Sequence, residues 1–228
     1  YAGTLGILRR FGADIRGVES DGEGILPDSL SYQIRSAISE GKRPKAFYTV
    51  PTFQNPLGWG ESMARREKVS EITARYGVPV WEDDCYVDLS FSGKEVPPAI
   101  RSLDDSGRTI YVASFSKNVG PGMRLGYVVA APPLMERMFS IKGTGSVSQF
   151  TAMAVHRFAQ RGLDAHIERV RGLLRAKRDA ILVALNDHLR GRACWTEPSG
   201  GLFVFVQMLD GSDAVMASQR GAEKGVLF

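Results

Sequence analysis

Short apolar runs alternate with amphipathic stretches along the first 131 residues of the chain. Five runs have the length and composition of buried strands, over residues 13–19, 45–50, 78–82, 109–113 and 125–131. Between these runs, apolar residues recur at helical spacing over residues 5–11, 27–40 and 61–76. The alternation predicts an α/β fold in which helices cover both faces of a mostly parallel sheet.

The pattern changes after Pro132, where helical spacing dominates. We expect helices over residues 150–161 and 164–189, a strand over residues 201–206 and a further helix over residues 211–225. These elements predict a large domain over residues 1–163. They also predict a smaller C-terminal α+β domain over residues 164–228, whose first helix connects the two domains.

Both ends of the chain have the pattern of a truncated protein. The sequence opens at Tyr1 inside a helical pattern and closes at residues 225–228, where a strand is beginning. We therefore expect the large domain to lack its N-terminal part and the small domain to lack its C-terminal part.

Composition narrows the class of protein. The 228 residues are 43% hydrophobic, enough for a buried core, and 29 basic and 25 acidic residues give a net charge of +4. The charges are interspersed, which disfavours nucleic-acid binding by this chain. The two cysteines, Cys85 and Cys194, lack disulfide or zinc spacing, and no apolar run approaches 18 residues. With no signal peptide at the start, we expect a cytoplasmic protein without membrane contact.

One amine lies between two predicted strands. Lys117 follows Ser114 and Ser116 at the end of the first strand, and Arg124 lies beyond a Gly-Pro-Gly turn. A buried lysine is unfavourable unless its charge is removed, for example by condensation with an aldehyde. The hydroxyls, the glycine amides and Arg124 suit a phosphate. Aldehyde and phosphate together indicate pyridoxal 5'-phosphate. The competing interpretation is a solvated lysine beside an ordinary turn.

Two further strand ends carry polar side chains. Asn55 follows the second predicted strand, while Asp83, Asp84 and Tyr86 follow the third. Ligands of open α/β sheets collect beyond the carboxyl ends of the strands, so these residues and Lys117 could converge. An acid there can pair with a pyridine nitrogen, and Tyr86 and Asn55 can hydrogen-bond the phenolate oxygen of the same ring.

Each of these residues has a simpler interpretation. The acids could cap a turn, Tyr86 could be a core tyrosine, and Asn55 could serve Asn-Pro turn chemistry. A metal site would need further ligands, and the three histidines are distant in the sequence. The Gly-Pro-Gly turn lacks the dinucleotide pattern, and the serines lack the context of a nucleophile. Phe203 and Phe205 fit a hydrophobic core better than a cofactor contact.

In combination, four motifs resemble the fold-type I pyridoxal phosphate enzymes, and among them the group of 2-aminoadipate and kynurenine aminotransferases. The resemblance extends over nearly the whole chain. The motifs are the Asn-Pro loop of residues 50–58, Trp81-Glu-Asp-Asp-Cys-Tyr86, Ser114-Phe-Ser-Lys117 with Arg124, and the turn and strand of residues 198–203. The resemblance implies a three-layer αβα large domain and a homodimer in which the partner chain completes each site.

The resemblance also implies individual roles. Lys117 would attach the cofactor and then move the proton between Cα and C4'. Asp83, three residues before the tyrosine, would face the pyridine nitrogen. Tyr86 and Asn55 would hold the cofactor O3', and Asn55 would also contact the substrate carboxylate.

The remaining implied contacts are with the phosphate and the ring face. Ser114, Ser116 and Arg124 would bind the phosphate, and Tyr1 would lie over the cofactor ring. The family's glycine-serine phosphate loop and its arginine for the substrate carboxylate are absent from this chain, which puts the competence of the chain alone in doubt. Leu57 stands where the family commonly has threonine.

We therefore expect a pyridoxal phosphate-dependent aminotransferase that moves an amino group from an amino acid to a 2-oxo acid. A transcription regulator with a DNA-binding winged helix fused to an aminotransferase-like domain is the alternative, since such a module would precede Tyr1. Another reaction of the same cofactor, such as β-elimination or decarboxylation, would use the same contacts. The identity of the substrate is not encoded in these motifs.

Overall fold

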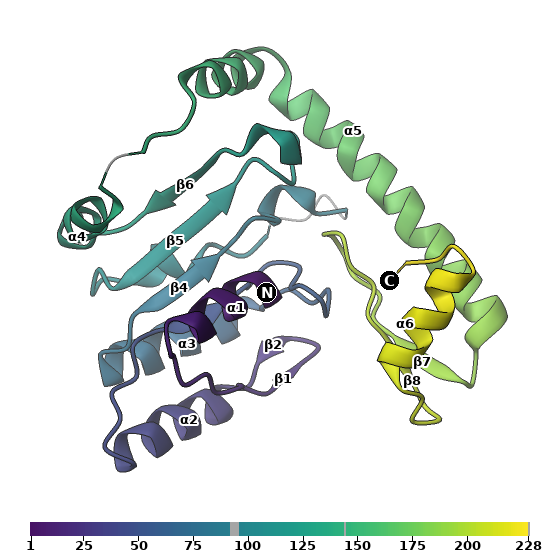
Figure 1. Cartoon of the computed structure of the whole chain (residues 1–228), viewed down its shortest axis with the longest axis horizontal. Helices are drawn as coiled ribbons and strands as arrows, with labels where there is room; N and C mark the ends of the chain where they lie inside the picture. Colours follow the sequence, from purple (N-terminus) through teal and green to yellow (C-terminus); the bar gives the residue numbers. More distant parts are fainter. Residues whose placement is uncertain (92–95, 144, 228) are drawn as a thin grey trace.

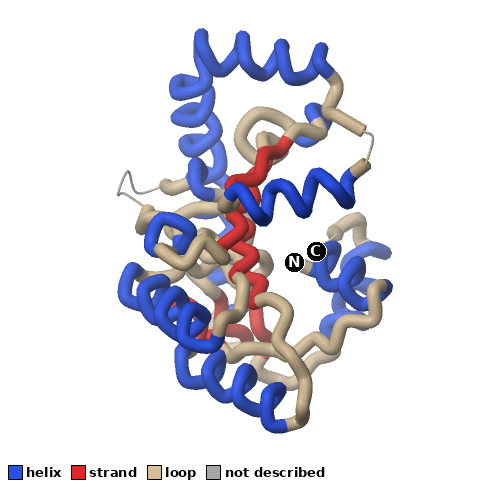
Figure 2. The backbone as a smooth tube through the Cα atoms, turned by 90° about the vertical axis from the view of Figure 1, so that its left-hand side faces the viewer, coloured by secondary structure: helices blue, strands red, loops and turns tan. Residues whose placement is uncertain are grey.

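The computed structural model describes residues 1–91, 96–143 and 145–227, and a four-stranded sheet lies at its centre (Figures 1 and 2). The strand order is β3-β4-β5-β6. The first three strands are parallel and β6 is antiparallel to β5. Their bounds are β3 (Phe47–Thr49), β4 (Val80–Asp83), β5 (Thr109–Ser114) and β6 (Gly126–Val129). The expected mostly parallel α/β sheet is confirmed, and the strands predicted over residues 45–50, 78–82, 109–113 and 125–131 are correct to within a few residues.

One face of the sheet packs against two amphipathic helices, α2 (Pro27–Ser39) and α3 (Met63–Tyr76). Side chains alternate along a strand, so Phe47 and Val80 point to this face and are buried. They form a hydrophobic core with Leu30 and Ile34 of α2 and with Val69 and Ile72 of α3. Pro27 at the first turn of α2 and left-handed Gly77 after α3 set the helix ends as the sequence predicts.

The opposite face of the sheet carries α1 (Ala2–Arg10), whereas α5 (Gln149–Leu189) contacts the short 3-10 helix Val87–Leu89 that follows β4. Thr4 of α1 hydrogen-bonds Tyr48 of β3, and Val170 and Leu174 of α5 pack near Tyr48 and Tyr86. Figure 2 shows the strands as a central column with helices to either side, as the alternating pattern predicted.

The strand expected over residues 13–19 is wrong. This segment is extended but has no ladder partner, and only the short hairpin β1 (Ser20–Asp21) and β2 (Gly24–Ile25) follows it. The segment is instead held across α2 by side chains. The Arg16 guanidinium binds Glu40 at 2.5 Å, and the Glu19 amide donates to Ser29 at 3.0 Å.

The helices expected over residues 150–161 and 164–189 form one continuous helix, α5, of 41 residues. Gly162 does not interrupt it, because a glycine inside a helix costs only about 1 kcal/mol and no proline is present. The helix α4 (Pro132–Lys142) precedes it and was not predicted. No described helix is both long and apolar enough to cross a membrane.

The C-terminal elements form a small hairpin and a helix beside the lower end of α5 (Figure 1). These are β7 (Ala193–Trp195), β8 (Val206–Met208) and α6 (Ala214–Glu223). The strand predicted over residues 201–206 is therefore wrong, because ladder pairing begins only at Val206. Gly200 and Gly201 pack instead against Phe53, and the Gly201 amide donates to the Leu89 carbonyl at 3.0 Å.

Candidate active site

The carboxylate at the end of β4 lies on the face of the sheet opposite the hydrophobic core. Tyr48 pairs with Trp81 in the β3–β4 register, so Tyr48 and Asp83 share one face. The Tyr48 hydroxyl donates a hydrogen bond of 2.8 Å to Asp83 Oδ2. Asp84 is 2% exposed and lies near Tyr111, at 3.4 Å, and Thr52. The two adjacent acids therefore have separate environments, and only Asp83 is half-buried.

Tyr86 and Asn55 come together beside this carboxylate. Their side chains are hydrogen-bonded, and the Tyr86 ring is buried with Phe203 packed edge-on at 5.8 Å and 88°. The Cys85 thiol interacts with both Tyr86 and Asp83. Burial raises the pKa of Cys85 to about 12, so the thiol stays protonated at neutral pH. Side-chain contacts thus run continuously from Asn55 to Asp83.

The end of β5 supplies paired hydroxyls. Asp83 pairs with Val112 in the β4–β5 register, so Ser114, two residues further, points to the face of Asp83. Ser114 Oγ lies 2.9 Å from Ser116 Oγ, 3.1 Å from the Ser116 amide nitrogen and 3.3 Å from the Leu125 carbonyl. The hydroxyls of Ser114 and Ser116 thus form a small group of hydrogen-bond donors at the carboxyl end of β5.

Lys117 follows this cluster, but its side chain is exposed. This exposure agrees with the competing interpretation of a solvated lysine, and the role of Lys117 stays a prediction. The sequence could not reveal the exposure, because it shows the flanking strands but not what covers the loop between them. The charge of Lys117 still acts on the Cys85 thiol, whose other charged neighbour is Asp83. Lys117 and Asp83 thus both act on the charge state of one thiol, Cys85.

Arg124 and Tyr1 make fewer contacts with the other candidate site residues. Arg124 is exposed, has a left-handed backbone with φ 47° and donates to the Pro121 carbonyl at 3.3 Å. No hydrogen bond joins its guanidinium to Ser114 or Ser116 among the described residues. Tyr1 is 55% exposed, and Asp83 and Cys85 lie near its main-chain nitrogen.

Sequence reasoning missed Tyr48, which donates to the predicted carboxylate. Once β3 and β4 are aligned as parallel neighbours, the alternation of side chains puts a tyrosine on the face of Asp83. That register was not available from periodicity alone. Phe203 fits the expected packing role, whereas Phe205 is 37% exposed and lies beside a surface hollow.

The arrangement fits the chemistry of pyridoxal phosphate. A carboxylate, a phenol–amide pair, a hydroxyl pair and an exposed amine follow the carboxyl ends of β3, β4 and β5. A pyridinium nitrogen suits Asp83, a phenolate oxygen suits Tyr86 and Asn55, and a phosphate suits the two serines. The observation behind this fit is that Asp83 and Ser114 share one face of the sheet on neighbouring strands, so the ring nitrogen and the phosphate of one molecule would lie on the same side.

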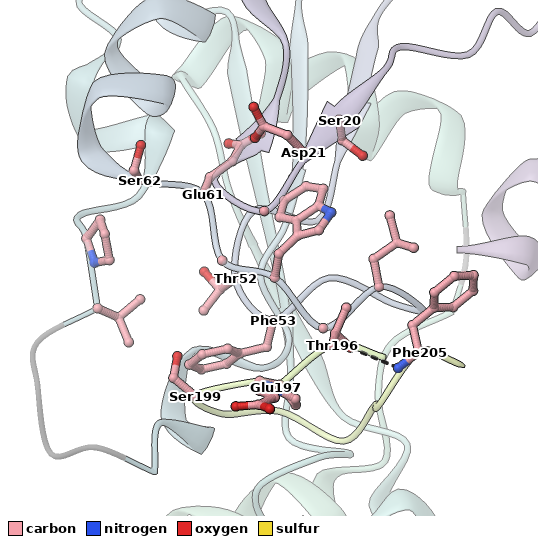
Figure 3. A pocket seen from close by; sticks show the side chains of 18 of the residues that line it. Ser20, Asp21, Thr52, Phe53, Glu61, Ser62, Thr196, Glu197, Ser199 and Phe205 are labelled. Carbon is pink, nitrogen blue, oxygen red and sulfur yellow. Dashed lines mark hydrogen bonds between the residues drawn. The ribbon is translucent and has the colours of Figure 1, made fainter. Parts of the chain in front are cut away.

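A second hollow of about 800 Å³ lies between the Asn55 loop and the hairpin of β7 and β8 (Figure 3). Phe53, Trp59 and Phe205 contribute aromatic surface, and Thr196 accepts a hydrogen bond of 2.9 Å from the Phe205 amide. Trp59 Nε1 and both Glu61 carboxylate oxygens are buried without a hydrogen-bond partner of good geometry among the described residues. Because these atoms are hidden from solvent, they do not offer binding groups to the hollow.

Two known aminotransferases are similar to this chain over its whole length. A crystal structure of a multiple substrate aminotransferase from Thermococcus profundus has a TM-score of 0.92 and 33% identity, and the match covers 100% of this chain and 57% of that chain. The mitochondrial kynurenine/alpha-aminoadipate aminotransferase of Bos taurus is 32% identical over 240 residues, which cover 100% of this chain and 56% of the relative.

A second kind of relative carries a different name. The uncharacterized HTH-type transcriptional regulator YdfD of Bacillus subtilis (strain 168) is 33% identical over 235 residues, covering 100% of this chain and 47% of the regulator. The chain spans about half the length of the curated relatives it matches. A family model described as aminotransferase class I and II matches residues 1–224. The chain therefore belongs to the class I and II aminotransferase family.

Proposed function

We propose that the intact protein is a pyridoxal phosphate-dependent aminotransferase that transfers an amino group from an amino acid to a 2-oxo acid. The observation that carries the proposal is the placement of Asp83 and Ser114 on one sheet face, with Lys117 three residues beyond Ser114. Family membership and relatives named as aminotransferases support it.

The cofactor residues divide into three roles. Asp83 holds the pyridine nitrogen in its protonated form, Tyr86 and Asn55 hold the O3' oxygen, and Ser114 with Ser116 holds the phosphate. Arg124 completes the phosphate site after its side chain turns from the Pro121 carbonyl. Tyr1 covers one face of the ring. Bound in this way, pyridoxal phosphate supplies an electron sink next to the Cα–H bond of the substrate.

Lys117 has two tasks in this proposal. It would anchor the cofactor in the resting enzyme, and as a free amine it would accept the proton from the substrate Cα and pass it on to C4'. Asn55 also binds the substrate carboxylate, which orients the Cα–H bond toward the amine. The exposed position of Lys117 gives the amine room to alternate between these tasks.

The test uses the intact protein and the Lys117→Ala variant, with Lys142→Ala as the matched control on exposed α4. Borohydride reduction should fix the cofactor on the peptide that contains Lys117, as mass spectrometry will show. A panel of amino acids with 2-oxoglutarate should give 2-oxo acid products. Lys117→Ala should lose turnover by about 10³-fold or more, because proton transfer and covalent attachment are lost together. Full activity of Lys117→Ala would refute the assignment.

The relative named as an HTH-type regulator supports one alternative function, a regulator that binds the same cofactor as an effector. A basic winged helix encoded upstream of Tyr1 and salt-sensitive DNA binding would favour it. Release of free ammonia without consumption of 2-oxoglutarate would instead indicate β-elimination, and release of carbon dioxide would indicate decarboxylation.

We also propose a cytoplasmic homodimer, with a large domain over residues 1–163 and a small domain over residues 164–228. Exposed apolar side chains around β6, α4 and the start of α5 support association, among them Tyr127, Val129, Phe139, Ile141 and Phe150. Light scattering of the active protein should give the mass of two chains. An active monomer would contradict the dimer without affecting the proposed chemistry.

A further inference from the structure

The carboxylate of Asp83 has one strong neutral donor. The Tyr48 hydroxyl binds Asp83 Oδ2 at 2.8 Å, a normal distance for a charge-assisted hydrogen bond. Asp83 forms no salt bridge among the described residues. The neighbouring Cys85 thiol also interacts with the carboxylate but is a weak donor. Tyr48 is therefore the main group that fixes the orientation of this side chain.

The direction of the hydrogen bond is set by the surroundings of the phenol. Burial and the negative charge of Asp83 raise the pKa of Tyr48, against a hydrogen bond from Thr4 that lowers it. The phenol therefore keeps its proton and donates it toward Asp83. Thr4 contacts the same phenol from α1, so Tyr48 is held by a second element as well.

The strand register makes this contact part of the fold. Tyr48 lies opposite Trp81 in the parallel ladder, two residues before Asp83 on the neighbouring strand. Since the main chains of β3 and β4 are hydrogen-bonded, the ladder fixes the separation of the two backbones, and the phenol can leave Oδ2 only through a change of side-chain rotamer. With Oδ2 held in this way, rotation of the carboxylate about its own axis is restricted.

We propose that Tyr48 is a positioning residue, which holds Asp83 in the orientation that pairs with the ring nitrogen of pyridoxal phosphate. The inference rests on the proposed cofactor site and adds to it a residue that does not touch the cofactor. Tyr48 acts through Asp83, so its effect on cofactor affinity disappears when the carboxylate is absent.

The experiment is a double-mutant cycle in the intact protein. The dissociation constant for pyridoxal phosphate is measured by equilibrium dialysis for the wild type, Tyr48→Phe, Asp83→Ala and the double variant. Tyr48→Phe should raise the constant about tenfold, the effect of one hydrogen bond to a charged group. In the Asp83→Ala background the same substitution should change it by less than about twofold.

Tyr111→Phe is the matched control. It removes a tyrosine–aspartate contact of 3.4 Å from Asp84, the adjacent acid, and should leave cofactor affinity unchanged. The unfolding midpoint of the cofactor-free Tyr48→Phe protein should stay close to that of the wild type, because water can replace the donor at half-buried Asp83.

The outcomes separate the two proposals. A wild type that binds no pyridoxal phosphate contradicts the proposed function. A wild type that binds it, with Tyr48→Phe unchanged, contradicts the positioning role. Equal losses from Tyr48→Phe in both backgrounds also contradict it, because the phenol would then act independently of Asp83. A lowered midpoint of the cofactor-free variant, together with additive losses, would assign Tyr48 to structural support.

Discussion

The buried carboxylate of Glu61 makes the stability of the protein depend on pH. Glu61 is 1% exposed, and neither carboxylate oxygen has a hydrogen-bond partner of good geometry among the described residues. Burial raises its pKa to about 7, while the charge of Arg66 and the Ile25 amide oppose the shift. The charge of Arg66 offsets only part of this rise in pKa, because the guanidinium forms no hydrogen bond with the carboxylate. Its donors bind the main-chain carbonyls of Glu61, Pro98 and Pro51 and the Thr52 hydroxyl.

The direction in which the free energy of unfolding changes with pH follows from the proton that the folded state retains. An unfolded glutamate loses its proton near its ordinary pKa of 4.5, whereas Glu61 in the folded state keeps it until about pH 7. Stability is therefore full below pH 4.5 and falls as the pH rises toward 7. Above that pH the folded state carries a buried charge that costs about 3 kcal/mol.

The perturbation is Glu61→Gln, which keeps the shape and removes the charge. We expect the variant to be about 3 kcal/mol more stable than the wild type at pH 8 and nearly equal to it at pH 4.5. Urea unfolding of the intact protein at intervals from pH 4.5 to pH 8, followed by circular dichroism, measures the difference. Parallel stability profiles for the two proteins would refute the reasoning.

Glu82→Gln is the matched control. Burial also raises the pKa of Glu82 to about 7, and the residue is fully buried. Its two oxygens, however, accept hydrogen bonds from the Ile100 amide at 2.7 Å and the Arg101 amide at 2.8 Å. A glutamine would point an NH₂ group at one of these donors. Glu82→Gln should therefore destabilise the protein by about 1–3 kcal/mol even at pH 8.

Other predictions concern backbone space and phosphate binding. Gly200→Ala should destabilise the protein by about 1–3 kcal/mol, because the new methyl would lie 2.3 Å from the Phe53 ring, whereas Gly172→Ala in open space on α5 should stabilise it by about 1 kcal/mol. Thermal unfolding will compare the two. Ser116→Ala should weaken binding of pyridoxal phosphate about tenfold and leave binding of pyridoxal unchanged. Arg124→Gln should behave in the same way, and equal losses for both ligands would contradict a phosphate role.

Local sequence signals predicted much of the sheet and the ends of the helices that pack on it. Pro27 and Gly41 bracket α2, and Gly77 ends α3, because their backbone preferences act within a few residues. Asp83 could be selected over Asp84 only through the resemblance, and the structure adds that the two acids have separate partners. The roles of both remain predictions.

What the sequence missed depends on long-range pairing. Residues 13–19 have strand composition but find no neighbouring strand, and Val206 begins a strand because residues 193–195 are available to pair with it. Tyr48 lies beside Asp83 because of the register between β3 and β4, in which Tyr48 pairs with Trp81, 33 residues later in the sequence. Periodicity within one segment carries no information about such partners.

The length of α5 has a mechanical consequence. Arg171, Arg175 and Arg178 recur on one side of this helix and donate to the carbonyls of Asp88, Phe91 and Pro198. The first two carbonyls follow the strand that carries Asp83, and the third belongs to the loop that connects β7 to β8. One helix thus holds both the segment that follows β4 and the loop between β7 and β8. A change in the tilt of the hairpin must therefore either break the hydrogen bond at Pro198 or displace the segment that contains Tyr86.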